Sequence, residues 1–190
     1  MLKEILINPI DNFIKEENDK KYIIVCDTLR SDFEKYILSL KKKNYAPAFV
    51  VKRDGTIHKL YDEKYYTEYI NIEKINKFSI YVALENSGKL FKNDKEFFNW
   101  CEDIIPIDSV DEIITNKDFS YYEKNTNKQI EALGQLIIYL GNKHNLPLKE
   151  ISMKNREDNP IIFLSSIDVY SYSPTPSFNV ERLNSIIFGN

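Results

Sequence analysis

The stretch that decides the fold begins APAFVVKRDGTIHKLYDE, from Ala46 to Glu63, and closes with KFSIYVALEN, from Lys77 to Asn86. Its first apolar run, FVV, consists of aromatic and β-branched residues that favour a strand. Asp54-Gly55 then gives a strong hairpin signal, because glycine adopts positive φ without steric cost. A returning strand is predicted over 56–60, where apolar and polar residues alternate, and a third strand over 78–85. These three strands make the scaffold of a sheet.

Two further strands are predicted from apolar runs elsewhere in the chain. Tyr22–Cys26 has the composition of a central strand that is buried on both faces. Ile161–Ser165 is predicted to be the last inner strand. Residues 96–101 are compatible with either a short helix or a continuation of the sheet. Residues 106–122 are expected to form a long loop with a short helical turn.

Helices are predicted from capping boxes and apolar stripes. Ser31 begins one capping box, and we expect a helix from there to Lys43. Thr126 begins a second, followed by an apolar stripe that we expect to end with Gly141 as its C-cap glycine. Further helices are expected around 10–17 and over 180–188.

These elements predict an α/β fold, in which a single mixed β-sheet is flanked by helices within one domain spanning residues 1–190. A hydrophobic content of 43% and a charged content of 29% are ordinary for a globular protein. The net charge of −3 gives no electrostatic reason to expect nucleic acid or an anionic membrane as a partner. No window approaches the roughly 18 uninterrupted apolar residues of a membrane span.

The two cysteines, Cys26 and Cys101, are too few for a disulfide framework, so reduced thiols are expected. The N-terminal stretch MLKEILINPIDNFIKEEND has acids and asparagines among its apolar residues. Because it has no apolar core region and no small-residue cleavage site, we expect no signal peptide.

Several motifs, in the right order, resemble the type-2 family of zinc-dependent N-acetylmuramoyl-L-alanine amidases, which includes phage endolysins and peptidoglycan recognition proteins. FVVKRDGTIHKL and SIYVALEN resemble the family's central hairpin and third strand, and YIIVCDT its first strand. YYEKNTNKQIEALGQLIIYLGNKHNLP resembles the family's long helix and its approach, and SPTPSFNVERL its C-terminal ending. The resemblance implies the type-2 amidase fold over most of the chain.

The resemblance also implies a catalytic zinc ion with three protein ligands and one open position. The family's first ligand is a histidine, and the matching position here is Cys26, followed by Asp27. The second and third ligand positions correspond to Ser166 and Ser173, and a serine hydroxyl is a poor zinc ligand. We therefore expect no metal or other cofactor.

Other positions of the family's groove also lack their usual side chains. A tyrosine–histidine pair of phage-type members corresponds to Pro47 and Ala48, and a tryptophan–histidine pair corresponds loosely to Glu68 and Tyr69. We interpret seven residues as a vestigial groove: Cys26, Asp27, Pro47, Ala48, Tyr69, Ser166 and Ser173.

The remaining candidates for chemistry are the histidines, one thiol and the tyrosines. His58 and His144 are expected on the surface, and Cys26 is expected to be a buried structural thiol. The 13 tyrosines cluster near the expected groove. They are either core-edge residues or an interface for protein partners, with four as candidate anchors: Tyr65, Tyr66, Tyr170 and Tyr172.

The function predicted from these residues is that of a catalytically inactive amidase-like protein, serving as a binding or structural module. A bacteriophage virion or tail component is the first expectation, with other virion subunits as partners. The location would be the virion for a phage-encoded chain and the cytoplasm otherwise. One alternative is an active amidase that degrades peptidoglycan, and another is a cytoplasmic regulator that binds a partner enzyme.

Overall fold

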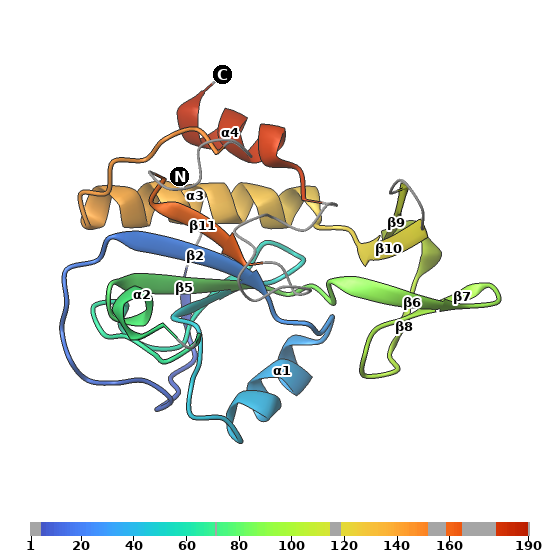
Figure 1. The fold of residues 1–190 in the computed structure, drawn as a ribbon, viewed down its shortest axis with the longest axis horizontal. Helices are drawn as coiled ribbons and strands as arrows, with labels where there is room; N and C mark the ends of the chain where they lie inside the picture. Colours follow the sequence, from blue (N-terminus) through green and yellow to red (C-terminus); the bar gives the residue numbers. More distant parts are fainter. Residues whose placement is uncertain (1–4, 71, 115–118, 152–158, 165–177, 190) are drawn as a thin grey trace.

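The computed structural model describes residues 5–70, 72–114, 119–151, 159–164 and 178–189. A six-stranded mixed sheet, in the order β1-β4-β3-β5-β2-β11, forms its centre (Figure 1). The strands are β1 (Ile5–Ile7), β2 (Tyr22–Asp27), β3 (Phe49–Val51), β4 (Ile57–Lys59), β5 (Ser79–Leu84) and β11 (Ile161–Leu164). The mixed sheet flanked by helices, predicted from the sequence, is confirmed.

The four strands β11, β2, β5 and β3 run parallel to one another, and β4 returns antiparallel to β3. Their carboxyl ends therefore meet at one edge of the sheet. All six residues of β5 and the four inner residues of β2 are buried. This agrees with the apolar run that predicted a central strand covered on both faces.

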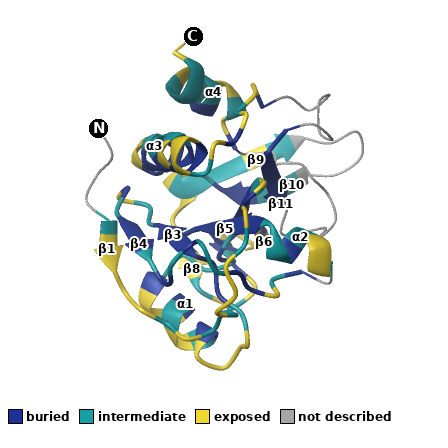
Figure 2. Cartoon of the chain, turned by 90° about the vertical axis from the view of Figure 1, so that its left-hand side faces the viewer, coloured by how far each residue is buried: buried dark blue, intermediate teal, exposed yellow. Residues whose placement is uncertain are grey.

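Helices cover the two faces of this sheet. They are α1 (Phe33–Leu40), α2 (Glu73–Lys77), α3 (Asn127–Lys143) and α4 (Val180–Phe188). Figure 2 shows α3 and α1 on opposite sides of the sheet, with α4 beyond α3. None of the helices in the described part of the chain is long and apolar enough to cross a membrane.

The start of α1 and the end of α3 differ from the prediction. Asp32, not Ser31, caps α1, because its carboxylate accepts a hydrogen bond from the backbone N–H of Lys35 at 3.0 Å. Gly141 does not end α3, which continues to Lys143. A Cβ on Gly141 would lie 2.6 Å from Cδ1 of Leu148. This glycine therefore leaves room for the Leu148 side chain, which follows the helix, and does not act as a C-cap.

The N-terminal segment also differs from the prediction, because residues 10–17 form no helix. Instead the segment runs along the hairpin: the N–H groups of Asn8 and Ile10 donate to the carbonyls of Lys59 and Leu60, both at 2.9 Å. Ile14 then forms an isolated antiparallel bridge with Tyr66. Pairing with the returning strand satisfies backbone groups that a helix would have satisfied internally.

Within the described strands, β11 lies at the edge of the main sheet and is not an inner strand as predicted. Its four residues are nevertheless all buried, and α3 and α4 lie over one face of this part of the sheet (Figure 1). An apolar run therefore indicates that a strand is buried, but it does not indicate that the strand lies at the centre of the sheet.

A second, five-stranded sheet replaces most of the loop expected over 106–122 and extends away from the main sheet (Figure 1). Its order is β8-β7-β6-β10-β9, with all pairs antiparallel. The strands are β6 (Lys89–Asn93), β7 (Glu96–Phe98), β8 (Ile104–Ile105), β9 (Val110–Ile114) and β10 (Phe119–Glu123). The short helical turn predicted in this region is confirmed as a 3-10 turn over Ile107–Ser109. A separate small core of Leu90, Phe97 and Ile105 holds the sheet together.

A buried carboxylate joins the hairpin to the end of α3. Glu63 is buried and pairs with Lys59 at 2.6 Å and with Lys143. Burial alone would raise the pKa of Glu63, but hydrogen bonds from Lys143 and Lys59 outweigh it and lower the pKa to about 2. The ionised form is therefore the one that the fold stabilises.

Gly134 allows α4 to pack closely on α3, and we expect Gly134→Ala to destabilise the protein. A Cβ there would lie 2.5 Å from Cγ2 of Ile186 in α4, and overpacking of this kind costs about 1–3 kcal/mol. Alanine would otherwise stabilise a helix by about 1 kcal/mol over glycine. Urea unfolding should show a lower free energy of unfolding for Gly134→Ala than for wild type. It should show a slightly higher one for Asn142→Ala, an exposed position in the same helix. A gain for Gly134→Ala would contradict this packing.

Glu63→Gln should lower the free energy of unfolding by about 2 kcal/mol at pH 7, because it leaves two lysines without their buried counter-charge. The folded pKa lies below the ordinary 4.5, so the contribution is complete above pH 4.5 and is lost as the pH falls towards 2. The difference between wild type and variant should therefore shrink over that interval in urea unfolding curves. Glu17→Gln, at an exposed pair with Lys64, is the control and should change little. A pH-independent difference would argue against the ionic role.

Candidate functional site

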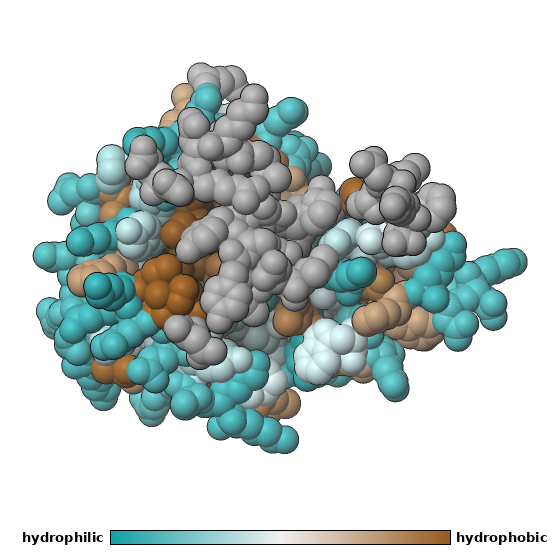
Figure 3. All heavy atoms as spheres, in the orientation of Figure 1, coloured by the Kyte–Doolittle hydropathy of each residue, from teal (hydrophilic) through white to brown (hydrophobic). Residues whose placement is uncertain are grey.

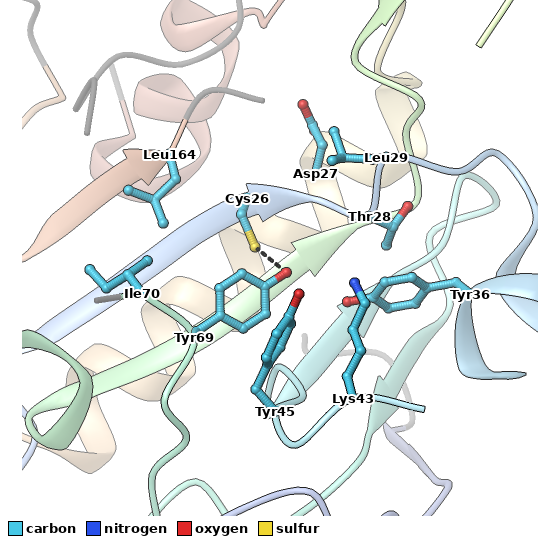
Figure 4. A pocket seen from close by; sticks show the side chains of 10 residues that line it. All are labelled: Cys26, Asp27, Thr28, Leu29, Tyr36, Lys43, Tyr45, Tyr69, Ile70 and Leu164. Atoms are coloured by element: carbon cyan, nitrogen blue, oxygen red, sulfur yellow. Dashed lines mark hydrogen bonds between the residues drawn. The ribbon is translucent and has the colours of Figure 1, made fainter. Parts of the chain in front are cut away.

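A pocket of about 190 Å³ lies at the carboxyl ends of β2 and β11, where the parallel strands of the main sheet end. Crevices at this edge of a parallel sheet are the usual ligand sites of α/β proteins. Figure 4 shows the side chains that line the pocket: Cys26, Asp27, Thr28, Leu29, Tyr36, Lys43, Tyr45, Tyr69, Ile70 and Leu164.

Cys26 forms the floor of the pocket and is buried. Its thiol donates weak hydrogen bonds to the Tyr69 hydroxyl at 3.5 Å and to the Val82 carbonyl at 3.8 Å. Burial raises the pKa of Cys26 to about 12, and the neighbouring Asp27 adds to the rise although the bond to Tyr69 opposes it. The thiol is therefore neutral at physiological pH, which agrees with the predicted structural role.

Three tyrosines form the wall above the thiol. The ring of Tyr69 stacks on Tyr81 at a centroid distance of 4.7 Å and meets the edge of Tyr45 at 5.0 Å. Tyr36 comes from α1 and is also buried. Burial raises the pKa values of Tyr36 and Tyr69 well above the ordinary value for a phenol. Both phenols are therefore neutral hydrogen-bonding groups.

The loop that carries Tyr69 is fixed by an asparagine. Asn76 accepts from the Ile70 N–H at 3.1 Å and from the Tyr81 hydroxyl at 2.7 Å, and its amide donates to the Ile70 carbonyl at 2.5 Å. All three contacts are buried, so they hold the backbone of this loop against the sheet. The position of the Tyr69 ring follows from them.

Asp27 follows Cys26 in β2 and points to the opposite side of the strand, away from the tyrosines (Figure 4). Its Oδ2 is shielded from solvent and makes no hydrogen bond with the described residues. Burial raises the pKa of Asp27 to about 8, and the charge of Glu123 adds to the rise. Asp27 is therefore largely protonated at pH 7.

Lys43 supplies the one ammonium group among the described residues that line the pocket. Its Nζ lies 4.9 Å from the centroid of the Tyr45 ring, in the range of a cation–π contact. The backbone of this segment is anchored by Asn12, whose amide donates to the carbonyls of Leu40, at 3.1 Å, and of Lys43.

The structure brings together three of the seven predicted groove residues, Cys26, Asp27 and Tyr69. Pro47 and Ala48 are buried just before β3 and are not among the lining residues. Ser166 and Ser173 lie outside the described residues. Sequence reasoning missed Tyr36, Lys43 and Tyr45. Of these, Tyr36 lay within the helix predicted from Ser31 to Lys43, Lys43 was the expected end of that helix, and Tyr45 carried no signal.

The candidate interface tyrosines are differently placed. Tyr66 is only 8% exposed, because the N-terminal segment bridges to it, and Tyr65 is partly buried and stacks on Phe13 at 5.4 Å. These two rings therefore border the core and offer little free contact area. Tyr170 and Tyr172 lie outside the described residues.

His58 is buried, contrary to its predicted surface position. Its ring stacks on Phe33 at 4.2 Å, and its Nδ1 lies 2.9 Å from the amide nitrogen of Asn8. His144 is half-buried just after α3, beside Glu63. Neither histidine is among the residues that line the pocket.

The described residues of the pocket do not fit a zinc ion. Zinc needs three deprotonated protein ligands, and no group of three histidine, cysteine or acidic side chains that could hold a metal occurs in the described ranges. Cys26 holds its proton in a hydrogen bond to Tyr69, and Asp27 points to the other side of β2. The Lys43 ammonium would also oppose a second cation.

Comparison with known proteins gives one consistent family. The family model described as N-acetylmuramoyl-L-alanine amidase (Amidase_2) matches residues 16–162. No curated protein matches the chain.

Two solved structures are similar in fold. The Staphylococcus aureus hydrolase AmiA, solved with its ligand, has a TM-score of 0.59 at 13% identity, covering 98% of this chain and 82% of AmiA. The E. coli amidase AmiD, solved with the substrate anhydro-N-acetylmuramic acid-L-Ala-D-gamma-Glu-L-Lys, has a TM-score of 0.50 at 15% identity, covering 78% of this chain. The match spans about half of AmiD, 49% of its length. At these identities the likeness shows the fold.

The burial of Cys26 predicts a large difference in reactivity between the two thiols. A pKa near 12 in place of the ordinary 9.0 lowers the thiolate fraction at pH 8 about a thousandfold, whereas Cys101 is half-buried. Native protein should give one rapidly reacting thiol with Ellman's reagent, and denatured protein two. Native Cys101→Ser should react very slowly, and native Cys26→Ser should match the wild type. Fast reaction of native Cys101→Ser would contradict the sealed position of Cys26.

Proposed function

Because the chain belongs to the N-acetylmuramoyl-L-alanine amidase family, we propose that it keeps the family fold without the family's zinc chemistry and acts as a binding module. The observation that carries this proposal is the state of Cys26, which stands where the resemblance places the first zinc ligand. Its thiol is buried, protonated and hydrogen-bonded to Tyr69. A ligand for zinc would have to be ionised and open to the metal.

The chemistry of the neighbouring groups supports the same proposal. Hydrolysis by a metal-activated water needs an ion with an open coordination position in a polar site. Apart from Lys43, and Asp27 in its ionised form, the lining side chains are uncharged; Tyr36 is a buried phenol and Tyr69 a half-buried one. The other two positions that correspond to family ligands are Ser166 and Ser173. Without a metal, this pocket lacks the metal-activated water on which hydrolysis of this kind depends.

An apolar row on the second sheet supports a role in binding protein partners. Phe98 lies directly opposite Phe91 on one side and Ile104 on the other, so the three side chains share one face. Phe91 is 59% exposed and Ile104 is 62% exposed. Figure 3 shows brown and tan side chains among teal ones over this part of the molecule. Exposed apolar side chains gathered in this way are typical of interaction surfaces.

Trp100 connects this row to the pocket. It is 56% exposed, its indole N–H donates to the Leu29 carbonyl at 2.6 Å, and Arg30 lies over its ring at 5.1 Å. Because Leu29 also lines the pocket, the exposed tryptophan stands beside the pocket mouth. A partner that covers the second sheet would therefore also border the pocket.

The partner is proposed to be a protein, with a phage particle as the first setting. That setting rests on the family resemblance, because the family includes phage endolysins, and the identity of neighbouring genes tests it. Tail or portal genes beside this one would support it, and cell-wall metabolism genes would argue against it. Peptidoglycan is the alternative ligand, since AmiD of the same fold was solved with a peptidoglycan fragment.

Zinc content and hydrolysis test the proposal directly. Protein purified without chelators should contain much less than one zinc per chain. It should release no peptides from purified peptidoglycan under conditions in which AmiD does. Binding to insoluble peptidoglycan without cleavage would favour the wall as ligand over a protein partner. Stoichiometric zinc, together with hydrolysis that Cys26→Ala abolishes, would establish an active amidase and overturn the proposal.

A further inference from the structure

Hydrogen-bond donors converge in the pocket at the end of β2. Figure 4 shows the hydroxyls of Tyr36, Tyr45 and Tyr69 and the Nζ of Lys43 gathered on the same side of the strand. We infer that this pocket binds a small monocarboxylate, whose oxygens accept hydrogen bonds from Lys43 and the tyrosine hydroxyls and whose apolar body lies among the rings. The inference deepens the proposed function and rests on it, because it requires a pocket without zinc.

The tyrosine hydroxyls are available to donate. Cys26 donates to the Tyr69 oxygen, so the proton of the Tyr69 hydroxyl points away from the thiol, on the side where Tyr36 lies. Tyr36 is 3% exposed, and its hydroxyl has no partner of normal hydrogen-bond geometry among the described residues. It does lie near enough to Tyr69 for the two phenols to influence each other's pKa. A buried hydroxyl without a good partner costs free energy, and an acceptor on a ligand would remove that cost.

The charge of the pocket favours a single negative charge on the ligand. Lys43 is the one cation among the described lining residues, and the carboxyl of Asp27 lies on the other side of β2. An ammonium and a carboxylate form a charge-assisted hydrogen bond, which is stronger than one between neutral groups. A dianion such as phosphate would keep an uncompensated charge among aromatic rings.

The pocket's size and walls favour a compact apolar body. Tyrosine rings, Ile70 and Leu164 make up much of its lining. Its volume of about 190 Å³ exceeds the roughly 150 Å³ of an engineered cavity that holds benzene. A single ring with a carboxylate therefore fits.

A cationic ligand is disfavoured, although tyrosine faces attract cations. The Lys43 ammonium already lies 4.9 Å from the centroid of the Tyr45 ring. A second cation at this ring would be repelled by the first. The Lys43 side chain therefore makes this aromatic pocket favour anions over cations.

Benzoate is the first probe, and benzamide is its neutral isostere. Titrations followed by calorimetry and by amide chemical shifts should show saturable benzoate binding, with shifts centred on the pocket, and at least about tenfold weaker binding of benzamide. Lys43→Met should weaken benzoate about tenfold and leave benzamide unchanged. Lys42→Met, at an exposed neighbour that does not line the pocket, is the matched control and should bind like wild type. Tyr36→Phe should weaken benzoate a few-fold without lowering the melting temperature.

A titration with N-acetylphenylalanine distinguishes between two sources of the carboxylate. Tighter binding of this compound than of benzoate assigns the carboxylate to the C-terminus of a peptide, and tighter binding of benzoate assigns it to a small free acid. Either result supports the inference.

The inference is overturned by equal binding of benzoate and benzamide, by tighter binding of benzylamine or inorganic phosphate, or by unchanged benzoate affinity in Lys43→Met. Zinc analysis of the same sample distinguishes failure of this inference from failure of the proposed function. Zinc-free protein that does not bind benzoate removes this inference alone. Stoichiometric zinc removes the proposed function with it.

Discussion

The carboxylate of Glu85 is the interaction on which the arrangement of the site depends. Its two oxygens accept hydrogen bonds from the backbone N–H groups of Phe33, at 2.8 Å, and Arg53, at 2.9 Å. Its own N–H donates to the Val51 carbonyl at 3.0 Å, and its carbonyl accepts from the Gln129 amide at 3.2 Å. One buried residue at the end of β5 thereby fixes the start of α1, the hairpin turn and α3 relative to the central strand. Because charge-assisted bonds to backbone groups are strong, this junction holds the edge at which the pocket lies.

The character of the pocket follows from that junction. The loop from β2 to α1 crosses the strand ends and is held by Thr28, whose hydroxyl donates to the Arg30 carbonyl at 2.6 Å and accepts from the Asn86 N–H at 3.2 Å. With its N-terminus fixed, α1 directs Tyr36 towards Tyr69 (Figure 4). A site that in a zinc enzyme must stay polar and open is here closed in by rings, and the thiol at its floor completes the core.

The parts of the fold that could be predicted are those specified by local sequence. The apolar runs of β2 and β5 and the capped stripe of α3 indicate burial within a few residues, and these elements formed close to their predicted positions. The second sheet could not be predicted in the same way. Its strands are two to five residues long, and cross-strand contacts such as Phe97 against Ile105 hold them together.

The site was also predictable only in part, because some of its residues are placed by contacts between distant parts of the sequence. Cys26, Asp27 and Tyr69 were placed by the resemblance, which carries three-dimensional information into the sequence. Lys43 and Tyr45 line the pocket from the segment after α1, whose backbone Asn12 binds. Such long-range hydrogen bonds leave no periodic signal in a single sequence.

The same separation between scaffold and site is what the proposed function requires, because it lets a family fold exist without the family's chemistry. A structural zinc contributes to folding, whereas a catalytic zinc sits in a site that a preformed scaffold presents. The core of this chain is built from the inner faces of the sheet and from α3, and its charged junctions at Glu63 and Glu85 need no metal. Cys26 is a buried neutral thiol that belongs to the core, and it leaves no unpaired charge at the floor of the pocket. Under the proposed function the surroundings of the catalytic centre are free to make new contacts, and the tyrosines and Lys43 are the described lining groups able to make them.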